Sequence, residues 1–382
     1  MKKIYYITAV FATLFLVGCG DGIDLPGVNV ETDLNKIPLP DNNVNLEQVE
    51  LKPSTEPMLH EGLHTEEDFQ RIRDKKAAGE EPWVSAYQLL VESQFSQKTA
   101  DTYPTEWIKR GISGDENYMN AARGATIVYQ QALRWKIEQD DEYAAKAVEN
   151  LNKWVQTCVG VTGNTNLSLA AGLYGYEFAI AGELLRDYGG WDRADFAAFQ
   201  NWLLKVFYPA NDDFLKRHHD TNALHYWANW CLCNIAAKMA IGIVTDRRDI
   251  YNEGIAHLQT GDTNGRLRRA IYHDYAPDYN FAQWQESGRD QGHTLMCVGL
   301  MGIICQLAWS QGDDFFAYDD NLFLRACEYA ACCNYTNETV PYTTYIWQKQ
   351  SQWGYPIPEE QRRRVCIDEG LRFGKQYLFG RR

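Results

Sequence analysis

Apolar residues recur at three- and four-residue intervals along most of the chain, which is the spacing of one face of an α-helix. Stretches that alternate apolar and polar residues, as strands do, are not convincing anywhere. Turn signals such as Gly189-Gly190 separate the periodic stretches, and His64-Thr65-Glu66-Glu67 predicts a helix start with Thr65 as the cap. The pattern predicts helices over residues 121–135, 143–155, 167–188, 194–207, 226–244, 291–309 and 321–333.

Two of these helices are apolar on every side. Residues 295–305 include no polar residue, and residues 226–244 are nearly as apolar, so both helices should be buried all round. Helical hairpins repeated over some 300 residues, with such helices inside, predict an all-α fold. The expected architecture is an (α/α) toroid or incomplete barrel with a central cleft or tunnel. A two-layer α-solenoid is the alternative.

The N-terminus predicts export. Lys2 and Lys3 precede an apolar run that is short for a membrane span and ends in Leu16-Val17-Gly18-Cys19. This ending resembles the bacterial lipobox, so we expect a lipoprotein signal peptide over 1–18 and a lipid anchor on Cys19. An ordinary signal peptide is the alternative. Residues 19–58 are rich in proline and are expected to form a tether, and residues 59–382 are expected to form a single domain. The expected location is the bacterial cell envelope, at the periplasm or the outer-membrane surface.

Composition narrows the function. The net charge of −14, which becomes −16 without the signal peptide, argues against a nucleic-acid partner. The 12 Trp and 23 Tyr suit either a sugar-binding cleft or a Trp-rich helical core. Nine cysteines remain besides Cys19, mostly in apolar helical runs, which predicts buried thiols with room for one or two disulfides. No cysteine or histidine set has the spacing of a metal site.

Histidine and arginine residues gather in three segments, 216–227, 266–273 and 285–294, each beside a predicted helix start. Backbone N–H groups and the helix dipole favour anions at such positions. On so acidic a chain, these segments imply a local positive pocket, and with the neighbouring aromatic residues they predict a concave site for a carboxylated sugar polymer. Taken singly, Arg266, Arg268 and Arg269 also fit a solvated face, and His225 also fits a core histidine.

These same segments resemble the alginate-lyase superfamily. The resemblance rests on Asn222 with His225-Tyr226-Trp227, on the stretch from Arg266 to Tyr272, and above all on the run ESGRDQGHT at 286–294. It extends over about residues 60–350 and is closest to polysaccharide lyase family 38, the Bacteroides-type alginate and glucuronan lyases. In the older family 5 the corresponding Asn and His are adjacent, whereas here Asn222 lies three residues before His225. The resemblance implies an α/α toroid, no cofactor and no obligatory metal, so activity is expected to survive a chelator.

The chemistry of a uronate lyase fits these residues. The enzyme removes the C5 proton of a uronate and expels the oxygen from C4, so the carboxylate must be neutralised. We expect Tyr272 to act as base and acid, with Arg266 lowering the energy of its phenolate form. His225 would be base or carboxylate neutraliser, and Asn222 a second donor. Glu286 would orient Arg289. The residues expected to bind the polymer are Arg289, His293, His218, His219, Trp227, Trp230 and Trp284.

Two other functions also fit the sequence. A glycoside hydrolase on an α/α barrel would need two carboxylates, which Asp220 and Glu286 could supply. A non-catalytic glycan-binding lipoprotein would keep the aromatic and arginine residues without cleaving the polymer. For Tyr272, the structural alternative is an aromatic patch with Tyr275 and Tyr279.

Overall fold

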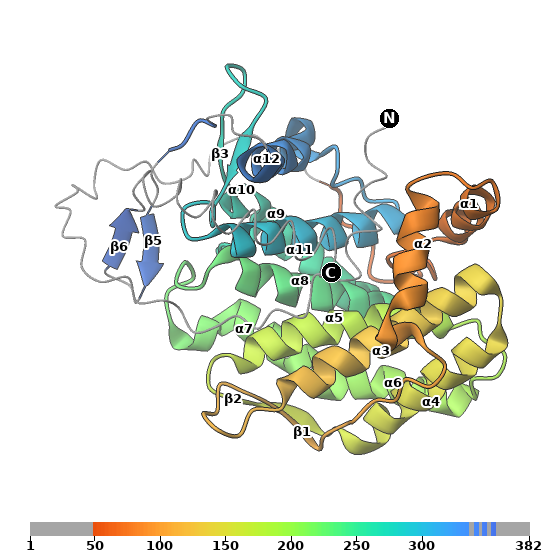
Figure 1. Cartoon of the computed structure of the whole chain (residues 1–382). Helices are drawn as coiled ribbons and strands as arrows, with labels where there is room; N and C mark the ends of the chain where they lie inside the picture. The colour runs from red at the N-terminus through yellow and green to blue at the C-terminus, as the bar shows by residue number, and fades with distance from the viewer. Residues whose placement is uncertain (1–48, 336–339, 344–345, 350–352, 357–382) are drawn as a thin grey trace.

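The computed structural model describes residues 49–335, 340–343, 346–349 and 353–356 (Figure 1). The signal peptide, Cys19 and most of the expected tether lie outside these residues, so export and lipid anchoring stay predictions. The elements in chain order are α1 (Glu66–Ala77), α2 (Trp83–Glu92), the short helix η4 (Gln94–Ser96), β1 (Trp107–Arg110), α3 (Tyr118–Glu138), α4 (Asp141–Thr157), β2 (Gly160–Gly163), α5 (Leu167–Leu185), α6 (Arg193–Val206), α7 (Tyr208–Arg217), the short helix η5 (His218–Asp220), α8 (Ala228–Val244), α9 (Arg248–Thr260), α10 (Leu267–Ala270), β3 (Ile271–Asp274), β4 (Ala282–Trp284), α11 (Gln291–Ser310), α12 (Tyr318–Tyr335), β5 (Ile346–Lys349) and β6 (Trp353–Pro356).

The helices form two layers, as expected for an (α/α) toroid. Helices α3, α5, α8 and α11 pack in that order as the inner layer, and α4, α6, α7, α9 and α12 pack against them (Figure 1). The predicted start of α1 is confirmed, because Thr65 and Asp68 form a capping box. Helix α11 is long and apolar enough to cross a membrane, but most of it is buried against α8 and α12.

The inner helices run in the same direction. Near their N-termini, Ser168 at the start of α5 bonds His219, and Asn229 at the start of α8 bonds Glu286 just before α11. At the other end, Arg186 after α5 donates to the backbone oxygen of Val244, the last residue of α8, at 2.9 Å. The starts of α5, α8 and α11 therefore share one end of the ring, and we call it the N-terminal end.

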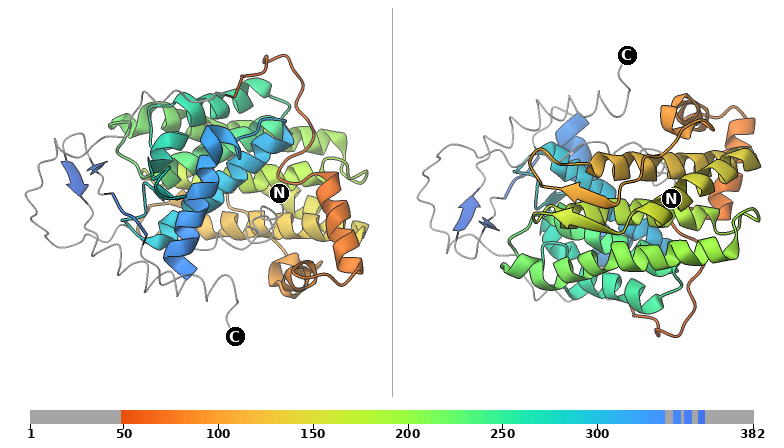
Figure 2. Two further views of the ribbon diagram at one scale, coloured as in Figure 1. Left: turned by 90° about the horizontal axis from the view of Figure 1, so that it is seen from above. Right: turned by 90° about the horizontal axis from the view of Figure 1, so that it is seen from below.

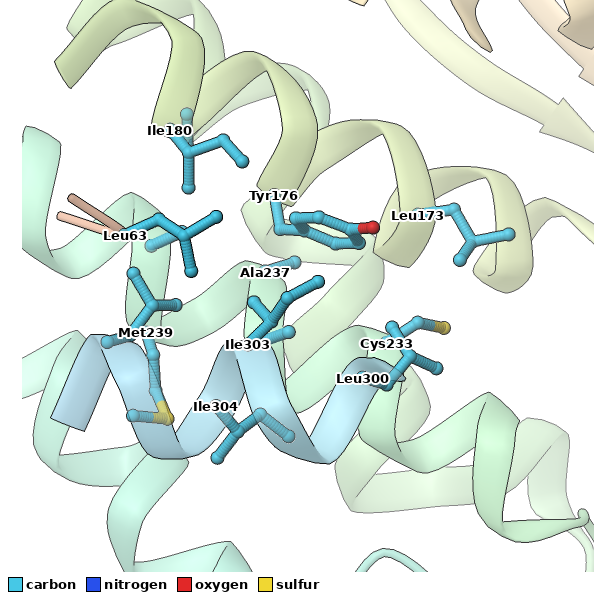
Figure 3. Close-up of a cluster of buried hydrophobic side chains, with 14 of the residues drawn as sticks. Leu63, Leu173, Tyr176, Ile180, Cys233, Ala237, Met239, Leu300, Ile303 and Ile304 are labelled. Atoms are coloured by element: carbon cyan, nitrogen blue, oxygen red, sulfur yellow. The ribbon is translucent and has the colours of Figure 1, made fainter. Parts of the chain in front are cut away.

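Apolar side chains fill the interior between the inner helices. Leu173, Tyr176 and Ile180 of α5 face residues of α8 and α11 such as Met239 and Ile303 (Figure 3). A second, aromatic part of the core lies between α4, α5 and α6, where Phe178 packs 5.4 Å from Trp154 and 5.2 Å from Trp202. These two tryptophans therefore belong to the core and not to a sugar-binding site.

Residues 49–58 are part of the folded domain, which corrects the expected boundary at residue 59. Their backbone oxygens accept hydrogen bonds from Arg248, Asn252 and Gln259 of α9. The chain then crosses the other end of the ring, where Gln311 after α11 bonds the backbone at 59 and 61. Leu63 enters the core beside Ile180 (Figure 3). This segment therefore covers the end of the ring opposite the N-terminal end.

Three short two-stranded sheets accompany the helices, although the sequence predicted no convincing strands. Strands β1 and β2 pair in parallel on one face of the molecule (Figure 2), while β3 pairs with β4 and β5 with β6 in antiparallel fashion. They are three or four residues long, which is too short to give a period-two signal. Six of the eight cysteines in the described part of the chain are buried, as predicted.

Glu177 on α5 is a buried acid that should make stability depend on pH. Burial raises the pKa of this carboxyl well above its usual range, and its Oε2 has no hydrogen-bond partner among the described residues. The folded protein therefore keeps a proton that the unfolded chain loses above pH about 4.3. The free energy of unfolding should then fall by about 1.4 kcal/mol per pH unit above that value, until the folded-state pKa is reached.

We predict that Glu177→Gln, which keeps the size and removes the ionisation, unfolds at a higher temperature than wild type at pH 8. At pH 5 the two proteins should differ little. Thermal unfolding of both at each pH measures this difference. A difference that is the same at pH 5 and pH 8 would show that ionisation of Glu177 has no part in it.

Candidate active site

The three segments rich in histidine and arginine come together at the N-terminal end of the ring. The backbone N–H groups of Ala228 and Asn229, the first residues of α8, donate to the side chains of Gln285 and Glu286 at 3.1 and 2.8 Å. The 266–273 segment joins them because β3 pairs with β4, and because Gln285 N donates to Ala270 O at 2.8 Å. Residues 40 to 60 positions apart in the sequence thus share one site.

Glu286 is the centre of this arrangement. It is completely buried, and its Oε1 accepts from both the backbone and the side-chain amide of Asn229, the latter at 2.7 Å. Its Oε2 pairs with the Arg289 guanidinium at 3.0 Å, as the sequence predicted. A carboxylate at the start of α8 also suits the helix dipole. Glu286 therefore fixes Arg289 and caps α8.

Arg289 in turn lies over the indole of Trp227, with its guanidinium carbon 5.0 Å from the ring centroid. Trp227 is the N-cap residue immediately before α8, and it is partly exposed. The stacking holds a cation beside an aromatic face at the helix start. This pair can bind a sugar that carries a carboxylate, which is the role predicted for both residues.

Asp290 and His293 form a second polar pair, at the start of α11. Asp290 Oδ1 caps the helix by accepting from His293 N at 2.7 Å, and its Oδ2 lies 2.5 Å from His293 Nδ1. Burial alone would raise the pKa of Asp290, but its hydrogen bonds with His293 and the charges of His293 and Arg289 lower it overall. The imidazole of His293 is therefore oriented through Nδ1.

The three histidines of the first segment differ in environment. His218 is buried between Phe214 and Cys231, and burial together with the charges of His219 and His225 lowers its pKa to about 4. It is a neutral core histidine, so the expected binding role of His218 is wrong. His219 and His225 are partly exposed. His219 Nε2 bonds Ser168 Oγ at 2.9 Å.

Tyr226 joins these two histidines, and the sequence reasoning did not single it out. Its ring lies 4.7 Å from that of His225, 5.8 Å from that of His219 and 4.7 Å from that of Trp230. Burial raises its pKa, although a hydrogen bond from Thr165 opposes the shift. The sequence could have indicated Tyr226 as a site residue, because it lies between His225 and Trp227, which were both predicted to belong to the site.

Asn222 and Asn229 also need a new assignment. Asn222 is exposed, and its side-chain oxygen accepts from Leu224 N at 2.8 Å, so it shapes the turn before α8. Asn229 is fully buried, and its Oδ1 has no hydrogen-bond partner among the described residues. Asn229, which the sequence reasoning missed, is therefore the asparagine built into the charged network.

Tyr272 lies in the short strand β3. It is half-buried, and burial together with Tyr275 raises its pKa to about 12. Among the described residues, no arginine contributes to this shift, contrary to the expectation for Arg266. Arg268 pairs with Asp319 and Asp274, whereas the buried Nε of Arg266 has no hydrogen-bond partner among the described residues. Tyr272 therefore holds its proton at neutral pH.

Trp284 cannot provide a stacking face, which corrects another expectation. It is fully buried, its indole N–H donates to Ala326 O at 2.9 Å, and Phe323 packs against its ring. The carboxylate pair proposed for a hydrolase is also wrong. Glu286 is sealed in the interior, while Asp220 is exposed and pairs with Arg217. In the described part of the chain, no group of three or more His, Cys, Asp or Glu side chains is arranged to hold a metal.

Comparisons with known structures show the same fold in several alginate lyases. A variant of alginate lyase A1-III complexed with a tetrasaccharide has a TM-score of 0.56 at 14% identity, over 74% of this chain and 82% of that one. An alginate lyase from Bacteroides ovatus has a TM-score of 0.51 at 14% identity, over 83% and 92%. Alginate lyase A1-III from Sphingomonas species A1 has a TM-score of 0.51 at 13% identity, over 72% and 79%.

At these identities the structures show a shared fold. A search of curated proteins gives no match. The sequence model of the alginate lyase family matches residues 73–338, well over half of the chain and including all three site segments. The chain therefore belongs to the alginate lyase family.

Proposed function

We propose that the protein is a polysaccharide lyase that cleaves uronate-containing polymers, alginate or glucuronan, by β-elimination. The observation that carries this proposal is the network at the N-terminal end of the ring, in which Glu286 holds Arg289 against Trp227 while Asp290 orients His293. Two fixed basic side chains beside an aromatic face suit a sugar that carries a carboxylate. Assignment to family 38 stays a prediction.

The histidines and Tyr272 would divide the proton transfers. Neutralising the carboxylate makes the C5 proton more acidic, and Arg266 and Arg289 are the cations suited to this task. His225 takes the proton from C5 as general base. Tyr272, whose raised pKa keeps it protonated, gives a proton to the oxygen leaving C4. This division replaces the double role that the sequence suggested for Tyr272.

A panel of polymers tests the proposed function. The protein is incubated separately with alginate, glucuronan and a neutral glucan, and new reducing ends are measured. We expect new ends with at least one uronate polymer and none with the glucan. Binding of alginate and glucuronan without cleavage would instead support a glycan-binding protein.

Asp290 is expected to act as a positioning residue for His293. Asp290→Asn keeps an oxygen that can cap α11 but removes the charge that favours protonated His293. We predict that KM for the polymer is up to about tenfold higher in this variant than in wild type at neutral pH. As the pH is increased, KM should begin to rise at a lower pH in the variant than in wild type. Asp290→Ala should show the same shift and also lose about 1 kcal/mol of stability with the cap. An unchanged pH profile of KM in Asp290→Asn would contradict this role.

A further inference from the structure

Arg110 is a buried arginine that pairs with no acid in the described part of the chain. It is 3% exposed, and its Nη1 makes a long hydrogen bond of 3.5 Å to the Tyr174 hydroxyl. Its guanidinium carbon also lies 4.6 Å from the centroid of the Tyr118 ring. Of the acids that follow it in the sequence, Asp115 pairs with Lys109 and Glu116 accepts from Gly111 N instead. No carboxylate among the described residues pairs with Arg110.

The other buried arginines differ from Arg110. Arg134 pairs with Glu138, Arg186 with Glu183 and Asp246, and Arg325 with Asp274. Arg248 donates to the backbone oxygens of residues 56 and 57. A buried cation without such partners is unfavourable for the folded state. Arg110 is thus the exception among the buried arginines of the described chain.

The backbone holds Arg110 in a fixed place. In β1, Ile108 and Arg110 are the buried positions, and Arg110 pairs with Gly163 of β2. A Cβ on Gly163 would come 1.7 Å from Arg110 O, so the close approach of the strands requires glycine there. Gly111, which follows, has a φ of +80°. The strand therefore directs Arg110 inward, towards the starts of α3 and α5.

This position is on the same end of the ring as the candidate active site. Tyr174, which bonds Arg110, and Ser168, which bonds His219, are both on α5. Six residues separate them, which is about 9 Å along a helix axis. Arg110 and His219 therefore contact side chains of the same helix, about two turns apart.

We propose that Arg110 binds a carboxylate of the polymer at a subsite away from the reacting sugar, an inference that rests on the proposed function. A guanidinium can bind a carboxylate with two parallel hydrogen bonds, and no acid among the described residues competes for Arg110. Tyr118 and Tyr174, whose rings stack 6.5 Å apart, form its wall. A carboxylate of the substrate would thus provide the negative charge that pairs with Arg110.

The test compares wild type with Arg110→Met, Arg110→Lys and the control Arg248→Met. Arg110→Met should raise KM for the polymer about tenfold or more with kcat little changed, because a buried charged hydrogen bond is lost in binding alone. The KM of Arg110→Lys should lie between those of wild type and Arg110→Met, since lysine keeps the charge but lacks the planar guanidinium group. Removing an unpaired buried charge should leave the melting temperature of Arg110→Met equal to or above that of wild type. Arg248→Met should lower the melting temperature and leave KM unchanged.

An unchanged KM in Arg110→Met would overturn the inference, and so would a fall in its melting temperature, which would mean that Arg110 serves the fold. A wild-type protein that cleaves no uronate polymer would refute the proposed function separately. In that case the affinity for uncleaved alginate decides: weaker binding by Arg110→Met than by wild type supports the subsite, and equal binding or none rejects it.

Discussion

Replacing Tyr272 by Phe is expected to lower turnover by roughly 100-fold or more, without lowering the melting temperature. The hydroxyl is the only group removed, and a positioned acid contributes about this much to the rate. The raised pKa of about 12 means that the proton is present at neutral pH and available to the leaving oxygen. Turnover at saturating polymer and thermal unfolding measure the two quantities.

Tyr275→Phe is the matched control for this experiment. The Tyr275 hydroxyl donates to Gln283 Oε1 at 2.5 Å and contacts Thr343 Oγ1 at 3.1 Å, so its task is structural. That variant should lose stability and keep most of its turnover. If Tyr272→Phe retained more than about a third of wild-type turnover, Tyr272 would belong to an aromatic patch with Tyr275, and the acid would have to be sought at His225 or Tyr226.

Replacing Glu286 by Gln is expected to destabilise the protein by about 3–5 kcal/mol, because it leaves the Arg289 partner of a buried ion pair uncompensated. Glu286 also accepts two hydrogen bonds from Asn229 and one from Cys297, so the start of α8 should loosen as well. Polymer affinity should fall because Arg289 is no longer held against Trp227. Denaturant unfolding and KM measure the two losses.

Glu177→Gln is a suitable comparison, since it also neutralises a buried glutamate but is expected to stabilise the protein at pH 8. A Glu286→Gln variant with wild-type stability and no activity would contradict the structural role.

The helical architecture was largely predictable because each inner helix carries its own signal. The absence of polar residues from 295 to 305 predicted a helix buried in the core, and α11 is that helix. Helices α7 and α9 were not predicted, since their apolar residues are interrupted by charges that pair across helices, such as Asp212 with Lys238. The docking of residues 49–58 rests on backbone oxygens, which leave no pattern in the sequence.

The candidate site was predictable as a set of segments but not as a set of contacts. Clusters of His and Arg beside helix starts marked the correct end of the ring. Whether a residue of these clusters can bind substrate depends on partners that are distant in the sequence. Arg268 pairs with Asp319, and Trp284 is covered by α12. His218 and His219 are adjacent in sequence, yet one is buried against Phe214 and Cys231 and the other meets Ser168. Arg110 and Asn229 lie singly, outside any cluster of His and Arg.

The mass and ultraviolet absorbance of the products test the central claim most directly. β-Elimination breaks the bond to the C4 oxygen without adding water, so each cleavage creates an unsaturated uronate that absorbs in the ultraviolet. We predict that alginate or glucuronan yields absorbing oligosaccharides lighter by one water than the corresponding hydrolysis products. Products of the hydrolytic mass, with new reducing ends and no gain in absorbance, would contradict the account.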